Sequence, residues 1–401
     1  MADGQAVGLS RCTGVSACLL MIHTALLGSA VMLPGVALLL LPCQLARRTW
    51  RAWAEVVQRE WFAFACFVLH RGLGIELVIH VPACSGSLSD VARKSLSHNV
   101  ILISNHRTRI DFMFLWGLCL MSGRLNSMKI VLKESLKRVP GFGWAVQCFG
   151  FIFLSRSTRD ADLATLRGAV ARHCVEPAGL TLVLFPEGTD LSESNVEKSH
   201  AYSKAKGLPV YNEVLHPKSA GFRAAAEAAM SASVRPVMLW DATMAYVEHQ
   251  PGVRPNEKDL FTGRPPREVH IRVESSSIDG LEADSLEDKC RDLFRSKEER
   301  LTAFYRPCRA SGAAADVGAI AEGCDSITLS SLPGAPRCCF IGLAVFAVLE
   351  STSLWAAWAY PRIMVLLGVG TAVSFEFLYR LGGVDGLEAR HCSVHPRPKA
   401  E

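Results

Sequence analysis

His106 and Asp111 are two residues that can share a proton, and they stand five positions apart directly after the apolar run 100–104. A histidine takes a proton from a hydroxyl near neutral pH, and a carboxylate on its second ring nitrogen fixes its tautomer. On one ideal helix the two side chains would diverge by about 140°. They can meet if His106 lies in the turn and Asp111 lies in the first turn of an apolar helix predicted for 110–121. The alternative is a structural histidine at a strand end, since the chain contains 12 histidines.

Glu187 and Gly188 form a second polar turn, within the sequence Phe-Pro-Glu-Gly-Thr that follows the apolar run 180–184. Pro186 cannot continue a hydrogen-bonded ladder, and a glycine lets the backbone approach a ligand closely. A carboxylate so near the end of a buried strand needs a partner, which we expect to be a cation or a substrate hydroxyl. The alternative is an ordinary strand-ending turn with an exposed glutamate.

Two further segments place basic residues at the ends of predicted elements. Arg156 follows the apolar run 149–154, where its planar guanidinium suits a phosphate. Pro217 and Lys218 lie in the segment 214–222, at a predicted helix start that also contains a glycine. Either basic residue could instead be a solvated charge, which is the commoner role for a lone arginine or lysine.

The order and spacing of these four segments resemble the motifs of the glycerolipid acyltransferases, the family that includes 1-acylglycerol-3-phosphate acyltransferases. The likeness runs from about residue 53 to about residue 305. The resemblance implies a role for each motif: His106 as the base, Asp111 as its partner, Arg156, Glu187 and Gly188 in binding the acyl acceptor, and Pro217 in the fourth motif.

Several details resemble the lysocardiolipin acyltransferase branch of that family in particular. These are two arginines inside the first motif, Phe-Pro-Glu-Gly-Thr-Asp at 185–190, and Val-Pro-Gly-Phe-Gly-Trp at 139–144. Two positions depart from common family patterns: Asp190 stands where many members carry arginine, and Lys-Ser-Ala at 218–220 stands where close relatives commonly show Arg-Thr-Thr. Both departures leave the reaction intact and the identity of the acceptor open.

Other chemistries lack their motifs in this chain. There is no G-x-S-x-G nucleophile turn and no P-loop for a nucleotide phosphate. The 14 cysteines form no C-x-x-C pair, which disfavours zinc and a disulfide framework and fits a catalytic domain in the cytosol. A net charge of only +5 does not indicate nucleic-acid binding. We therefore expect no metal site and no cofactor apart from acyl-CoA as co-substrate.

The composition indicates a membrane protein, with 50% hydrophobic residues and a mean hydropathy of +0.21. The run 15–42 is long enough to cross a bilayer, and Pro34-Gly35 is expected to kink or split it. A signal peptide is the rival interpretation, but the apolar run continues past its candidate cleavage site at Ala30. Arginines cluster after this run, at positions 47, 48, 51 and 59, so the positive-inside rule predicts a cytosolic active site.

Two more apolar runs, 338–360 and 363–379, lie near the C-terminus and are split by Pro361-Arg362. They predict either a hairpin or one span with a surface helix, whereas the short run 61–69 predicts an interfacial or core helix. The expected organisation is a membrane anchor at 1–50, a catalytic domain at 51–306, a flexible linker at 307–336, hydrophobic membrane segments at 337–380 and a tail at 381–401.

Apolar runs and amphipathic segments alternate through the catalytic part. Such alternation predicts an α/β fold with a mixed, largely parallel sheet covered by helices, and the candidate site residues then fall at strand ends. The predicted strands are 75–81, 100–104, 128–132, 149–154, 180–184, 236–241 and 268–273. The predicted helices are 110–121, 160–174, 221–231 and 285–304.

Together these observations predict an acyl-CoA-dependent O-acyltransferase that acts on a lysophospholipid at the bilayer. His106 would deprotonate the free hydroxyl, and a backbone N–H such as that of Gly188 would stabilise the oxyanion. Lysophosphatidic acid and lysocardiolipin both remain open as acceptors. The expected location is the endoplasmic reticulum or another endomembrane. The alternative from another class is an inactive lipid-binding or scaffolding relative with the same fold.

Overall fold

A mixed eight-stranded sheet forms the centre of the computed structural model, which describes residues 3–85, 90–91, 96–247, 254–331 and 335–390. The strand order is β4-β3-β5-β2-β6-β7-β1-β8. The strands are β1 (Glu76–Pro82), β2 (Asn99–Ser104), β3 (Met128–Lys133), β4 (Ile152–Leu154), β5 (Thr181–Leu184), β6 (Val237–Tyr246), β7 (Glu268–Ser277) and β8 (Cys324–Thr328).

Most strand pairings are parallel, as predicted. Only β6 with β7 and β1 with β8 pair in the antiparallel direction among the described residues. β2 lies between β5 and β6 and is parallel to both. Because the carboxyl ends of parallel strands meet at one edge of a sheet, the turns after β2 and β5 lie side by side there.

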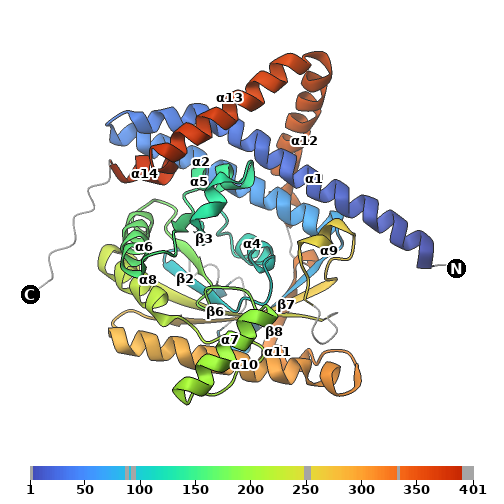
Figure 1. Cartoon of the computed structure of the whole chain (residues 1–401), viewed down its shortest axis with the longest axis vertical. Helices are drawn as coiled ribbons and strands as arrows, with labels where there is room; N and C mark the ends of the chain where they lie inside the picture. Colours follow the sequence, from blue (N-terminus) through green and yellow to red (C-terminus); the bar gives the residue numbers. More distant parts are fainter. Residues whose placement is uncertain (1–2, 86–89, 92–95, 248–253, 332–334, 391–401) are drawn as a thin grey trace, which may run out of the picture.

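Helices cover both faces of the sheet (Figure 1). Side chains of β2 alternate between two cores: Val100 and Leu102 face the core formed with the N-terminal helices, while Ile101 and Ile103 face the opposite core. The first face carries α1 (Asp3–Val36), α2 (Gln44–Phe67), α4 (Asp111–Met121) and α5 (Phe142–Cys148). The second carries α6 (Arg159–Cys174), α8 (Ser219–Ala232), α10 (Ala283–Ser311) and α11 (Gly318–Ala321).

The remaining helices and turns lie outside these two layers or connect them. Short turns are η1 (Ala37–Leu40), η2 (Val68–Gly72), η3 (Ala83–Ser85), η4 (Glu134–Arg138) and η5 (Leu329–Ser331). The other helices are α7 (Glu193–Lys206), α9 (Glu257–Phe261), α12 (Ala335–Ala359), α13 (Pro361–Arg380) and α14 (Gly383–Arg390).

The segment 307–336, expected to be a flexible linker, instead contains regular structure. α10 continues to Ser311, and β8 pairs with β1 from Val78–Thr328 to Pro82–Cys324 as an edge strand. The sequence of β8, Cys-Asp-Ser-Ile-Thr, has only one strongly apolar residue, because an edge strand with exposed side chains needs none. The composition of this segment therefore resembles that of a linker.

Part of the tail 381–401 is also ordered. Helix α14 packs against the N-terminal part of the chain, where Glu388 accepts hydrogen bonds from Trp50, at 2.8 Å, and from Arg51. All three side chains are buried. Arg51, one of the arginines expected to mark the cytosolic side, is thus enclosed within the protein. Residues 391–401 lie outside the described part of the chain.

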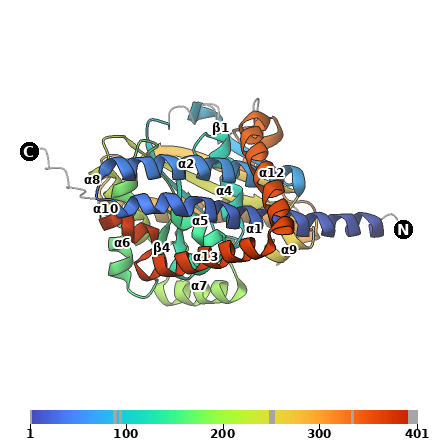
Figure 2. The same cartoon turned by 90° about the horizontal axis from the view of Figure 1, so that it is seen from above.

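Within the described part of the chain, two helices have the length and composition needed to cross a bilayer: residues 11–40 and α13. A buried core helix and a signal sequence pass the same test. α1 packs against both α2 and α13, which lie on either side of it in Figure 2, and 44% of the apolar window of α1 is buried, against 11% for α13. α1 continues past Pro34 to Val36 and passes directly into η1, so the proline does not split the helical run. Residues 61–67 belong to α2 and are largely buried, as a core helix requires.

Candidate active site

Asn105 fixes the turn that follows β2. Its side-chain amide donates to the carbonyl of Met244 in β6 at 3.0 Å, and its side-chain oxygen accepts the N–H of the same residue at 2.8 Å. This pair of bonds continues the contact between β2 and β6 beyond the last paired residue of β2. The backbone of the next residue, His106, therefore leaves the sheet in a defined direction.

His106 and Asp111 meet as the sequence predicted, with the histidine in the turn and the aspartate at the start of α4. The distance from His106 Nδ1 to Asp111 Oδ2 is 3.1 Å. A carboxylate only accepts, so Nδ1–H donates to it and Nε2 is left as the unprotonated nitrogen that can act as a base. The Asp111 side chain is fully buried, whereas that of His106 keeps 19% exposure. The pair thus has the geometry of an oriented general base.

Two further donors hold the Asp111 carboxylate in place. The backbone N–H of Thr108 donates to Oδ2 at 2.9 Å, and the hydroxyl of Tyr246 donates to Oδ1. Tyr246 is the last residue of β6 and is itself fully buried. Every contact of Asp111 is therefore with a group fixed by the turn or the sheet, which limits rotation of the carboxylate and of the imidazole bonded to it.

The electrostatic surroundings raise the pKa of His106 above its usual 6.5. Burial lowers this pKa, but the hydrogen bond and charge of Asp111, together with the charges of Glu187 and Asp190, outweigh burial. The ring also stacks on Phe185, with ring centroids 4.3 Å apart. The environment therefore strengthens the basicity of the imidazole and restricts its orientation.

Glu187 has partners of a different kind from those expected. One carboxylate oxygen accepts the backbone N–H of His106 at 2.7 Å, and the other accepts the backbone N–H of Leu215 at 2.9 Å. The side chain is 2% exposed, and burial raises its pKa to about 7. Glu187 thus joins the second motif to the first and to the segment before α8. It positions the base, and its prediction as an acceptor-binding residue remains untested.

The Gly188 N–H, which the sequence suggested as an oxyanion donor, donates to the carbonyl of Phe185 at 2.9 Å within the turn. Gly188 adopts φ +76°, a conformation that favours glycine. Its carbonyl accepts from the guanidinium of Arg156 at 3.0 Å. The structure therefore brings the second and third motifs together through the carbonyl of Gly188.

The fourth motif lies beside the second. The backbone N–H of Lys218 donates to the carbonyl of Pro186 at 2.7 Å. The Lys218 side chain lies next to Gly188, where an added Cβ would stand 3.2 Å from Nζ. Pro217, the residue predicted for this motif, lies between Leu215 and Lys218, whose N–H groups are both bound to the second motif. Pro217 therefore lies in the backbone segment that joins the fourth motif to the second.

The two arginines of the first motif have different surroundings. Arg107 is buried, pairs with Glu213 at 2.9 Å, and has its guanidinium 4.0 Å from the ring centroid of Tyr305. Arg109 is 73% exposed and lies 3.8 Å from Asp190. Arg107 therefore has a structural role, in a buried ion pair with Glu213. The three exposed basic residues that belong to the four motifs, here named the basic rim, are Arg109, Arg156 and Lys218.

Tyr246 is a site residue that the sequence analysis missed, because the predicted strand ended at Asp241. An acid inside a strand suggests its end, yet Asp241 is buried in an ion pair with Lys297 of α10 at 2.6 Å. The strand continues for five more residues. The available signal was the apolar residue at every second position, 240, 242, 244 and 246, which share one face of the strand. Within the described ranges, no group of three or more His, Cys, Asp or Glu residues could hold a metal ion.

An oriented base lies at the edge of a largely parallel sheet, where it can take the proton of a hydroxyl group. A family model described as Acyltransferase matches residues 85–240. Lysocardiolipin acyltransferase 1 of Mus musculus is 33% identical over 270 residues, 67% of this chain and 68% of the relative. The corresponding protein of Danio rerio is 31% identical over 350 residues, 86% of this chain and 84% of the relative.

The chain belongs to the glycerolipid acyltransferase family. A probable 1-acyl-sn-glycerol-3-phosphate acyltransferase 5 of Arabidopsis thaliana is 36% identical over 209 residues, 51% of this chain and 53% of the relative. Among solved structures, the 1-acyl-sn-glycerophosphate (LPA) acyltransferase PlsC of Thermotoga maritima aligns with a TM-score of 0.39 and 15% identity, covering 73% of this chain and 98% of that one. A likeness this low adds nothing to the argument from sequence.

Proposed function

We propose that this chain is an acyl-CoA-dependent O-acyltransferase that esterifies the free hydroxyl of a lysophospholipid. The observation that carries the proposal is the hydrogen bond of 3.1 Å between His106 and Asp111, which leaves Nε2 unprotonated on a partly exposed ring. Membership of the acyltransferase family supports the reaction class. The names of the relatives, which include lysocardiolipin and 1-acyl-sn-glycerol-3-phosphate acyltransferases, support the class of acceptor.

The proposed reaction needs one base. His106 Nε2 takes the proton of the acceptor hydroxyl while the hydroxyl oxygen attacks the thioester carbonyl carbon. Asp111 keeps the ring oriented and stabilises the imidazolium that forms. Collapse of the tetrahedral intermediate breaks the carbon–sulfur bond and releases coenzyme A as a thiolate, and the proton held on the His106 imidazolium neutralises this thiolate and restores the base. A thiolate is a good leaving group, so no acyl-enzyme intermediate is required.

Charge on the basic rim supports an acceptor that carries phosphate. Arg156 and Lys218 approach Gly188 from two sides, and Arg109 lies three residues from the base. A guanidinium binds two phosphate oxygens with parallel hydrogen bonds, whereas the lysine ammonium acts as a point charge. We assign Arg156 to the acceptor phosphate.

An acceptor panel tests this function. The full-length protein in purified membranes is given labelled acyl-CoA with lysophosphatidic acid, lysocardiolipin and other lysophospholipids in turn, and His106→Ala serves as the matched inactive control. We expect label to enter at least one diacyl product only in the wild-type protein. Acyl transfer from a carrier protein but not from acyl-CoA would overturn the donor assignment. Lipid binding without transfer from any donor would favour the inactive scaffold.

We further propose that the active site faces the cytosol, in the endoplasmic reticulum or another endomembrane. The support is the arginine cluster that follows the first apolar run. A tag at the N-terminus is expected to be lumenal, and one inserted near Leu281 cytosolic. In sealed microsomes, protease should remove the second tag and spare the first. Protection of the tag near Leu281 would reverse the orientation and favour a secretory signal.

A further inference from the structure

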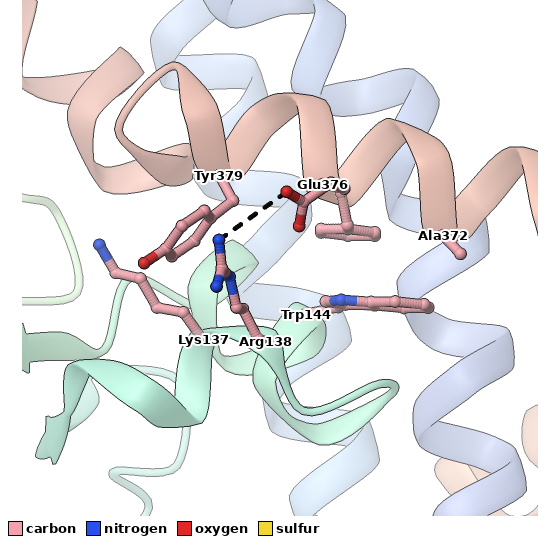
Figure 3. A pocket seen from close by; sticks show the side chains of 7 residues that line it. Lys137, Arg138, Trp144, Ala372, Glu376 and Tyr379 are labelled. Atoms are coloured by element: carbon pink, nitrogen blue, oxygen red, sulfur yellow. Dashed lines mark ion pairs between the residues drawn. The ribbon is translucent and has the colours of Figure 1, made fainter.

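A cavity of about 350 Å³ lies between α13 and the segment formed by η4 and α5. It is within the size range of small-ligand pockets. None of its lining residues belongs to the four motifs of the active site. Figure 3 shows side chains from both elements converging on it, and the lining residues are Lys137, Arg138, Trp144, Ala372, Phe375, Glu376 and Tyr379.

Aromatic contacts form the walls of this cavity. Trp144 of α5 stacks on Phe375 of α13, with ring centroids 4.9 Å apart and planes 1° from parallel. The guanidinium of Arg138 lies 4.0 Å from the ring centroid of Tyr379. Tryptophan and tyrosine are enriched where a bilayer meets water, because their rings are apolar and their edges polar. The walls therefore suit the headgroup level of a membrane.

The cavity contains two basic residues, Lys137 and Arg138, and the acidic partner of Arg138, Glu376, is loosely placed. Arg138 lies 3.8 Å from Glu376, longer than a hydrogen bond, and the two side chains are 59% and 45% exposed. Arg380 also reaches Glu376, at 3.3 Å. Lys137 is only 7% exposed and pairs with Asp385 of α14 at 3.1 Å. Three cations thus share two carboxylates, so a phosphate can replace Glu376 beside Arg138.

The cavity lies at one end of a helix that is apolar on its outer surface. α13 is long enough to cross a bilayer, and little of it is covered by the rest of the protein. Leu366, Val373 and Phe377 are exposed large apolar side chains along it. Two of its three charged residues, Glu376 and Arg380, lie in its last two turns, and the third, Arg362, lies at its start. When α13 contacts acyl chains, the cavity at this end lies at the level of the phosphates.

We propose that this cavity binds the phosphate of an anionic bilayer phospholipid, as a second lipid site separate from the acceptor site. Arg138 makes the principal contact, and Trp144 and Tyr379 contact the glycerol region. Glu376 occupies the place of the phosphate when the site is empty. The proposal concerns binding alone, so it does not depend on which acceptor the active site uses.

The experiment measures lipid binding by native mass spectrometry of the full-length protein in detergent, titrated with phosphatidic acid and separately with phosphatidylcholine. Arg138→Gln should weaken binding of phosphatidic acid about five-fold, the effect of removing one basic residue near a bilayer surface. Arg167→Gln is the matched control, since Arg167 is a half-exposed arginine paired with Glu227 at 3.6 Å on another face. The control should bind as the wild-type protein does.

Glu376→Gln separates ligand binding from a structural role. If phosphate and Glu376 compete for Arg138, removing the carboxylate charge should strengthen phosphatidic acid binding. A variant that weakens binding as Arg138→Gln does would show that the ion pair only holds α13 in place, and would overturn the proposal. Unchanged binding in Arg138→Gln would also overturn it.

Two soluble competitors identify the source of the phosphate. Inorganic phosphate and glycerol 3-phosphate should fail to displace phosphatidic acid, because neither contacts the apolar wall. Displacement by either would mean that the cavity takes a free phosphate compound and no lipid. Acyl transfer is measured separately on the same variants, so a failure of the proposed reaction is distinguished from a failure of this site.

Discussion

The base and the basic rim are two adjoining regions of the site that are held in opposite ways. His106 contacts Asp111, Glu187 and Phe185, and both acids are buried. Arg109, by contrast, is 73% exposed, with its nearest acidic oxygen at 3.8 Å. The base is therefore fixed before substrate arrives, whereas the guanidinium of Arg109 is held only by long ion pairs. Chemistry depends on fixed orientation, and recognition of a mobile lipid headgroup does not.

The two buried carboxylates of the site divide the work of positioning. Asp111 binds the imidazole ring and so sets its tautomer and direction. Glu187 accepts hydrogen bonds from the backbone N–H groups of His106 and Leu215, and so fixes the position of the His106 backbone. A buried carboxylate that loses its hydrogen-bond donors destabilises the folded protein, so each carboxylate needs the donors that it positions. Predictions about the two regions follow from this contrast.

The largest effect is expected for His106→Ala. Loss of a general base should reduce turnover by about 100-fold to 10,000-fold. Initial rates with a labelled acyl donor measure it, with expression level and membrane association as controls that should not change. A variant that keeps the wild-type rate would remove His106 from the mechanism and abolish the contrast.

Asp111→Asn should lower turnover by about 100-fold and move the acid limb of the pH–rate profile. His106 acts when neutral, and its pKa lies above 6.5, so the wild-type rate falls as pH drops through that raised pKa. Removing the Asp111 charge lowers the pKa, so the acid limb should move to lower pH even though the maximum rate is smaller. A profile of kcat/KM against pH measures this. An unmoved limb would assign the titration to another group, such as Glu187.

The smallest effect is expected in the basic rim. Arg156→Ala should raise the KM for the lysophospholipid by about 10-fold to 150-fold, the value of one charge-assisted contact, and should change the KM for acyl-CoA far less. Arg156→Lys should recover only part of the loss, because a point charge lacks the bidentate geometry. Arg167→Ala provides a control for loss of an exposed arginine.

Two outcomes would revise the assignment of Arg156. Equal weakening for both substrates would indicate that its hydrogen bond to the Gly188 carbonyl has a general structural role. Selective weakening for acyl-CoA would assign Arg156 to the phosphates of the coenzyme and not to the phosphate of the acceptor.

Most of the sheet could be predicted because its strands are buried on both faces and read as apolar runs. β2 and β5 are buried along their whole length. β8 could not be predicted, since an exposed edge strand carries no such run. The end of β6 was missed because Asp241 looks like a strand-ending acid until its partner, Lys297, is known. A local sequence pattern therefore does not reveal contacts between residues that are far apart in the sequence.

The site divides along the same line. His106 and Asp111 are five residues apart, so their meeting depends on one turn and could be inferred locally. The partners of Glu187 are backbone groups 81 and 28 residues away, and Tyr246 is 135 residues from the aspartate that it contacts. Nearly every residue has a backbone N–H, so the sequence does not reveal which of them donates to Glu187. Motif recognition therefore located these positions without revealing what each one touches.

The pairing of Arg51 with Glu388 has a consequence for how the chain is made. The two residues are 337 positions apart, and both side chains are buried. During synthesis, α2 emerges from the ribosome long before α14 exists, so Arg51 must wait for nearly the whole polypeptide before Glu388 can neutralise it. The first helices to appear are thus among the last to be completed. A protein shortened before residue 383 would lose this closing contact while keeping every residue of the active site.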